Sequence, residues 1–158
     1  MSPDALAQEF ASTLYLPWQF MLARVLGATI LTGLIGLERE ARGRPAGLRT
    51  HMLVGLAASA YCITTLELIA MDYGTEVKLD PLRLVEAVTA GVAFLAAGMI
   101  VFSKGEVKGL TTGASLWLAA AVGVAVGMGF WPLAAMVTLA ALTIIRAIGL
   151  LEGRAEGD

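Results

Sequence analysis

The chain has 158 residues, of which 58% are hydrophobic and only 15% charged, with a net charge of −2. Soluble domains average about 45–50% apolar and about 25% charged residues, so this composition excludes an ordinary soluble domain and favours an integral membrane protein. Cys62 is the single cysteine, which excludes an intrachain disulfide. Because it lies in an apolar run, we expect it to be a small buried or lipid-facing residue.

The N-terminal segment, residues 1–17, contains no Lys or Arg and therefore lacks the positive region of a cleavable signal peptide. Leu6, Phe10 and Leu14 share one face of a potential helix. This pattern predicts an interfacial helix on the outer leaflet, ahead of the first membrane span.

Apolar segments predict an all-α transmembrane bundle of five helices, because lipid-exposed strand edges leave backbone groups unpaired. The segments cover residues 18–37, 51–71, 84–102, 112–128 and 131–148. The last two are short, and we interpret them as two helices because Gly127, Gly129 and Pro132 form a strong turn signal. The predicted transmembrane domain is 18–148, followed by a short tail, 149–158.

Lys and Arg are distributed unevenly among the loops, which predicts the orientation. Six charged residues lie within residues 38–49, four of them arginines, and Lys104 and Lys108 lie in the third loop. We therefore expect these loops and the C-terminus on the cytoplasmic side of the membrane, and the N-terminus outside.

A short internal repeat is present, since GLRT at Gly47–Thr50 recurs as GLTT at Gly109–Thr112, 62 residues later. The same offset maps Gly36 onto Gly98, which is typical of a parallel repeat of a helix pair. The simpler interpretation makes Thr50 and Thr112 helix N-caps. The alternative is an anion-attracting vestibule formed by the two helix N-termini, together with nearby basic residues: Arg39, Arg42, Arg49 and His51.

Charged residues within the spans are expected to pair or to line a hydrated cavity. We predict that Arg24 pairs with Glu67 or Glu86 in the outer half of the bundle; the alternative is separate snorkelling to the headgroups. After the first span, Glu38 and Arg42 are i,i+4 neighbours and can pair on a continued helix.

Motifs for catalysis, phosphate binding or metal binding are not recognisable in the sequence. The acids Glu38 and Glu40 stand among arginines, which oppose cation capture, so no metal site is predicted. His51, the sole histidine, is expected to have a polar surface role. We therefore predict a protein that is not an enzyme, uses no cofactor and binds no nucleic acid.

Small residues repeat every four positions in two of the spans, which predicts close helix packing within the bundle or across an oligomer. The stripes are Ser115, Ala119, Gly123 and Gly127 in the fourth span, and Ala87 and Gly91 in the third.

Four ordered blocks resemble the MgtC/SapB family of bacterial inner-membrane proteins: GLIGLERE, AGLRTHMLVGL, DPLR with GVAFLAAGMI, and GLTTGASLWLAAAVGVAVGMG. They span about residues 24–130. The family's signature positions correspond here to Gly36, Glu38, Arg39, Glu40, Ala46, Gly47, Leu48, Arg49, Thr50, Asp80, Pro81, Arg83, Gly91, Phe94, Leu95, Ala97, Gly98, Gly109, Leu110, Thr111 and Thr112.

The resemblance implies a role linked to magnesium limitation or acid stress, as a regulator rather than a carrier. Ala96 stands where many members have glycine, and the sequence resembles the shorter form that lacks a C-terminal ligand-binding domain. We therefore expect a non-enzymatic regulatory or accessory protein that contacts the lipid bilayer and either itself, as a homo-oligomer, or another membrane protein. The alternative is a small transporter or channel for Mg²⁺, H⁺ or an anion.

Overall fold

The computed structural model describes residues 15–71, 80–103 and 106–155, and within these ranges it consists of helices joined by loops and turns, with one short β-hairpin. The helices are α2 (Trp18–Ala41), α3 (Leu48–Ala70), α4 (Pro81–Met99), α5 (Leu110–Gly127) and α6 (Trp131–Ala155). Four of them, α2 to α5, are long and apolar enough to cross a membrane, and α6 has a shorter apolar part. The predicted all-α membrane bundle is confirmed. The predicted interfacial helix lies mostly outside the described residues.

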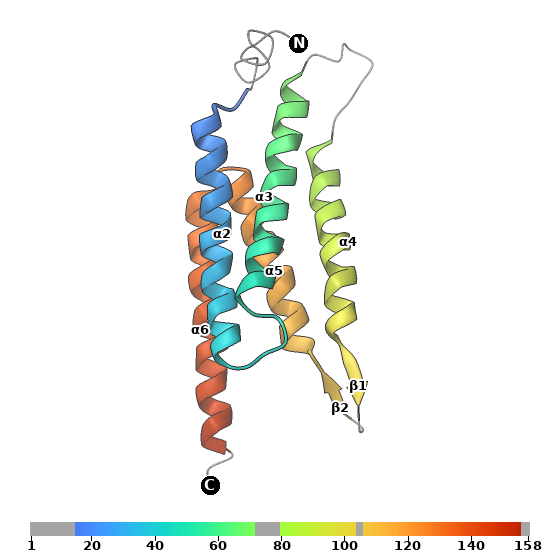
Figure 1. Cartoon of the computed structure of the whole chain (residues 1–158), viewed down its shortest axis with the longest axis vertical. Helices are drawn as coiled ribbons and strands as arrows, with labels where there is room; N and C mark the ends of the chain where they lie inside the picture. The colour runs from blue at the N-terminus through green and yellow to red at the C-terminus, as the bar shows by residue number, and fades with distance from the viewer. Residues whose placement is uncertain (1–14, 72–79, 104–105, 156–158) are drawn as a thin grey trace, which may run out of the picture.

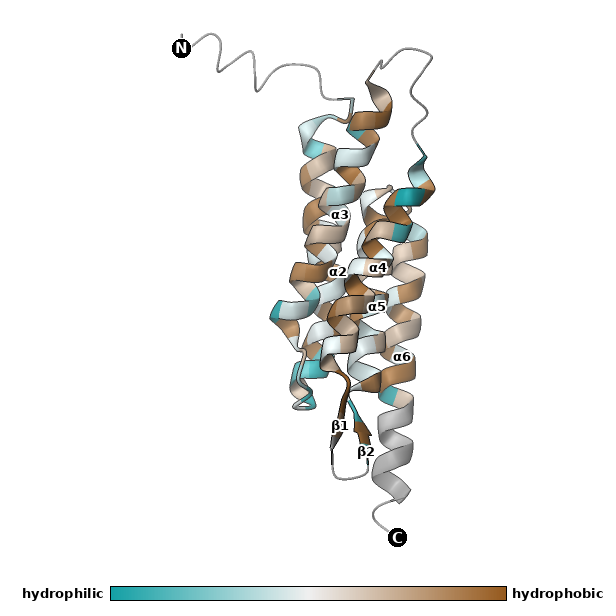
Figure 2. Ribbon diagram, turned by 90° about the vertical axis from the view of Figure 1, so that its right-hand side faces the viewer, coloured by the Kyte–Doolittle hydropathy of each residue, from teal (hydrophilic) through white to brown (hydrophobic). Residues whose placement is uncertain are grey.

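Helix α5 is the centre of the bundle and contacts the other four helices (Figure 1). Its faces are lined by small residues and it has many buried positions, whereas α4 at the edge of the bundle buries only Val88. Figure 2 shows apolar residues along all the helices, and many large ones are exposed, as expected for a protein surrounded by lipid. The main core cluster joins α2, α5 and α6 through residues such as Ala28, Ile35, Val122 and Val126.

Between α4 and α5 the chain forms a β-hairpin of β1 (Val101–Ser103) and β2 (Glu106–Lys108), which pair antiparallel. The sequence prediction extended the third span to residue 102 and was wrong there, since α4 ends at Met99. Gly109 follows the hairpin and has a left-handed backbone conformation, with φ +89°. A Cβ at this position would overlap the carbonyl oxygen of Met99. Only glycine adopts this conformation at low cost.

One end of the bundle carries the 42–47 loop, the β-hairpin and the C-terminal turns of α6, and we call it the arginine end (Figure 1). The opposite end, where α2 and α4 begin and α3 ends, is called the outer end. These names follow the predicted orientation and describe positions along the bundle.

Candidate functional site

The most polar part of the buried interior lies at the arginine end, on the last turns of α2. Glu38 is 8% exposed and Arg39 is 3% exposed. Because successive helical residues point about 100° apart, the two side chains face different neighbours. Charged side chains are almost never this buried without partners, so their surroundings define the candidate site.

Arg39 points to the start of α5, where its Nη2 donates to Thr112 Oγ1 at 3.4 Å. Its Nε is buried and has no hydrogen-bond partner among the described residues. Thr112 is itself 2% exposed and lies in the first turn of α5. The contact therefore places a poorly satisfied guanidinium at a helix N-terminus, which is a positive environment.

His51 is fully buried beside this pair, so the predicted surface role is wrong. Its Nδ1 lies 2.9 Å from Gly47 O, which can only accept, so Nδ1 carries a proton. Its Nε2 lies 3.1 Å from Ser115 Oγ, and that hydroxyl is also 2.8 Å from Thr112 O. One hydroxyl proton thus has two acceptors within reach, and the network joins α3 to α5.

Helix α3 receives its N-terminal cap from a residue that precedes the loop. Glu40 Oε2 accepts from Leu48 N at 2.8 Å, and the N-cap position is Gly47. Thr50 is therefore not the N-cap, and in α5 the N-cap is Gly109 rather than Thr112. The predicted capping threonines are wrong because each helix begins at the leucine that follows the glycine.

Glu38 faces the opposite side, toward α6, and its Oε1 forms the predicted ion pair with Arg42 Nε. Neither carboxylate oxygen accepts a well-directed hydrogen bond within the described part of the chain. Beside this pair lies a cavity of about 400 Å³ between α2 and α6, whose lining includes Arg146. The sequence analysis missed the approach of Arg146 because no local spacing links residues this far apart in the chain.

At the outer end, the predicted pairing of Arg24 with Glu67 or Glu86 is not formed. Arg24 Nη1 instead donates to Gly127 O at 2.8 Å, at the C-terminus of α5, where carbonyl groups lack helical partners. Glu67 accepts from the backbone N–H groups of Tyr15 and Leu16, both at 2.9 Å. Arg24 and Glu67 therefore each have a backbone partner instead of one another.

The other predicted site residues are more peripheral. Asp80 accepts from Leu82 N at 3.0 Å and caps α4. The remaining ones have exposed side chains, and they do not join the buried network: Arg49, Arg83, Glu86 and Thr111. Of the four basic residues predicted around a vestibule, Arg39 and His51 are buried. Arg49 is exposed and Arg42 pairs with Glu38, while Glu40 occupies the N-terminus of α3.

The small-residue stripe of α5, comprising Ser115, Ala119, Gly123 and Gly127, is buried. An added Cβ at Gly123 would lie 2.6 Å from Gly55 O of α3, and one at Gly127 would lie 2.6 Å from Cys62 Cβ. The stripe therefore packs within the bundle, which is one of the two arrangements that the sequence predicted, and does not present Gly123 to a partner.

Glycines of α2 and α4 behave differently from each other. An added Cβ at Gly36 would lie 2.8 Å from Leu48 Cα, so this glycine lets α2 and α3 approach closely at the arginine end. At Gly91 and Gly98 a Cβ would meet nothing within 4 Å. The stripe on α4 is thus not used for packing among the described residues.

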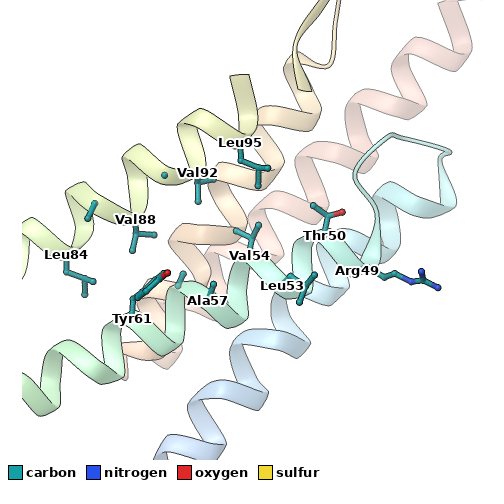
Figure 3. A pocket seen from close by; sticks show the side chains of 13 residues that line it. Arg49, Thr50, Leu53, Val54, Ala57, Tyr61, Leu84, Val88, Val92 and Leu95 are labelled. Carbon is teal, nitrogen blue, oxygen red and sulfur yellow. The ribbon is translucent and has the colours of Figure 1, made fainter. Parts of the chain in front are cut away.

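Next to this unused face, a cleft of about 650 Å³ separates α3 from α4. Figure 3 shows Leu84, Val88 and Val92 pointing from α4 toward α3, with Tyr61 facing them and Arg49 directed away at the arginine end. The cleft is almost wholly apolar, and small residues such as Gly91 keep it open.

Comparison with known proteins gives a clear family assignment. Residues 25–154 match the MgtC family. The chain is 34% identical to the "Putative magnesium transporter YhiD" of Escherichia coli K12 over 84% of this chain and 62% of that protein. It is 40% identical to "Protein MgtC" of Brucella abortus over 78% of this chain and 49% of that protein. "Protein SrpB" of Synechococcus elongatus is 32% identical over 89% of this chain and 83% of that protein.

The chain therefore belongs to the MgtC family, as the sequence blocks indicated. It spans less than two thirds of the length of YhiD and about half that of the Brucella protein. No solved structure matches the chain significantly. The described residues contain no group of three or more His, Cys, Asp or Glu side chains arranged to hold a metal ion.

Proposed function

We propose that this member of the MgtC family is a non-enzymatic accessory or regulatory membrane protein that binds another membrane protein through α4. The observation that supports this is the state of α4 itself. Only Val88 of its 19 residues is buried, whereas 61% of the apolar membrane window of α5 is buried. Phe94, on the outward face of α4, is 85% exposed.

Contact with lipid alone does not account for the composition of this face. Helices associate in membranes through small residues that let their backbones approach closely. Ala87 and Gly91 have this character, and both are exposed and line the α3–α4 cleft. A Cβ at Gly91 would meet no atom of the described structure within 4 Å. A transmembrane segment of a partner, including a second copy of this chain, fits such a surface.

The proposed setting follows from the family and the charges. The resemblance links the chain to magnesium limitation or acid stress. The bacterial relatives support a bacterial cytoplasmic membrane. The excess of Lys and Arg near the 42–47 loop supports an orientation with the arginine end inside and the N-terminus outside.

Photocrosslinking in cells grown at limiting Mg²⁺ tests this proposal. A photoreactive amino acid replaces Phe94 on α4, and the matched control replaces Leu139 on α6, which is 65% exposed. We expect a discrete membrane-protein adduct, a dimer of this chain included, from position 94 only. Equal adducts from both positions, or lipid adducts alone at position 94, contradict the proposal.

A second candidate function is transport, because buried polar groups follow the α2, α3 and α5 contacts and the relative YhiD is named a putative magnesium transporter. They include Thr32, Arg39, His51, Ser59 and Ser115. Reconstituted protein with a Mg²⁺ indicator inside the liposomes separates the two functions. The regulatory proposal predicts no flux above protein-free liposomes; flux that disappears in His51→Ala establishes transport instead.

A further inference from the structure

We propose that the cavity between α2 and α6 at the arginine end is a binding site for a phospholipid with a phosphoethanolamine headgroup. The cavity measures about 400 Å³ and lies beside the last turns of α2. It is independent of the α3–α4 cleft, which lies on other helices.

The charges in the cavity suggest the ligand. Two arginines, Arg42 and Arg146, and one acid, Glu38, line the same space. In the described part of the chain the ion pairs are Arg42–Glu38 and Lys108–Glu106, so Arg146 has no acidic partner there. A phosphodiester supplies one negative charge that both guanidinium groups can bind.

The buried carboxylate of Glu38 requires that the ligand also carry a hydrogen-bond donor. Its side chain is 6% exposed, and its carboxylate oxygens lack well-directed hydrogen bonds within the described residues. A buried carboxylate is costly without donors. Because the Arg42 side chain is 32% exposed, it can turn from Glu38 to a lipid phosphate. The primary ammonium of the same headgroup then takes its place on Glu38 and donates hydrogen bonds.

The position in the bundle matches a lipid. Leu34 and Leu37 line the cavity on its membrane side and are 44% and 55% exposed, which offers an apolar surface to acyl chains. The charged residues lie farther along α2, at the end of the span. A phospholipid in the leaflet at the arginine end therefore presents its phosphate and amine where the charges are. A divalent cation fits less well, because two arginines repel it.

Native mass spectrometry of the purified full chain tests this site with equimolar phosphatidylethanolamine, phosphatidylcholine and phosphatidylglycerol of identical acyl chains in detergent micelles. Phosphatidylcholine keeps the charges of phosphatidylethanolamine but has no N–H donor. We expect the wild-type chain to retain phosphatidylethanolamine at least about ten-fold better than phosphatidylcholine, the effect of one charge-assisted hydrogen bond. This comparison requires no substitution, and equal retention of the two lipids overturns the proposal.

Variants assign the effect to the cavity. Glu38→Gln is expected to lower phosphatidylethanolamine retention about ten-fold while phosphatidylglycerol retention stays equal or rises, because the acid that repels an anion is gone. Arg146→Gln should weaken retention of phosphatidylethanolamine and of phosphatidylglycerol about five-fold each, because each headgroup loses one cationic partner for its phosphate. The matched control is Arg49→Gln, an exposed arginine at the same end that lines the α3–α4 cleft and not this cavity. A wild-type preference for phosphatidylglycerol, or an equal effect of Arg49→Gln and Arg146→Gln, contradicts the site.

Discussion

The α3–α5 contact allows a sharp test of the packing, using two glycines that look alike in sequence. Gly123 of α5 and Gly91 of α4 each lie in a predicted small-residue stripe. The perturbation is the same single methyl group, Gly→Ala, at either position. The structure predicts opposite signs, because Gly123 faces Gly55 and Ala58 of α3, whereas nothing lies within 4 Å of a Cβ at Gly91.

The magnitude follows from the contact distances. A Cβ at Gly123 would lie 2.6 Å from Gly55 O and 2.9 Å from Ala58 Cβ. Since ordinary contacts begin near 3.4 Å, the backbones of α3 and α5 must separate by several tenths of an ångström. Gaps of about 0.5–1 Å forfeit a quarter to a half of each contact's dispersion energy, and overpacking usually costs about 1–3 kcal/mol. We expect Gly123→Ala to lower the free energy of unfolding by about 2 kcal/mol.

Gly91→Ala gains up to about 1 kcal/mol, since alanine favours a helix over glycine and no clash opposes it. Cys62, the single cysteine, is buried on α3 beside Gly127, so its reaction with a thiol-reactive fluorophore during heating reports opening of this interface. The melting temperature should fall by roughly 4–8 °C in Gly123→Ala and rise slightly in Gly91→Ala. Equal shifts of the same sign in both variants would refute the packing argument.

Two further substitutions test the polar contacts at the arginine end, using the same thermal assay. Glu40→Ala removes the acceptor for Leu48 N, which lies 2.8 Å away, and should cost about 1 kcal/mol, whereas Glu86→Ala, at an exposed acid on α4, should change little. Equal effects of these two would show that the cap contributes nothing. Ser115→Ala leaves His51 Nε2 buried without its 3.1 Å partner and should destabilise the chain by about 1–3 kcal/mol; a melting temperature at the wild-type value contradicts the network.

The helices themselves could be predicted because apolar segments of membrane length leave few alternatives. The turn at Gly129 was also predictable, and its φ of +85° explains why glycine stands there. The predicted ends of the helices were less accurate. Helix α2 continues past the predicted residue 37 to Ala41 and includes charged residues, and α4 stops at Met99 rather than at residue 102. Hydropathy does not mark either boundary, since helical hydrogen bonds continue as long as the backbone permits them.

Among the charged residues, contacts between sequence neighbours could be predicted, whereas contacts between distant residues could not. The Glu38–Arg42 pair followed from i,i+4 spacing and is present. Arg24 was expected to find an acid, yet it binds the carbonyl of Gly127, because the C-terminus of a helix offers free acceptors that sequence spacing does not reveal. The burial of His51 was missed for a related reason: its partner Ser115 comes from a helix whose register against α3 depends on packing.

The 62-residue repeat gives a physical reason for the open cleft beside α4. Gly47 and Gly109 occupy equivalent N-cap positions of α3 and α5. In the first pair the short 42–47 loop lets Glu40 cap the second helix. The equivalent position in the second pair is Phe102, which has no acceptor and belongs to the β-hairpin.

The β-hairpin therefore replaces the capped loop, and the contact that Gly36 makes with α3 has no counterpart at Gly98. Helix α4 packs mainly on α5 and stays apart from α3 along the cleft. The first helix pair is thus closed by its own charges and glycines, whereas in the second pair the small residues of α4, Ala87 and Gly91, stay uncovered. This asymmetry is the reason to look for a binding partner on α4 rather than on the buried stripe of α5.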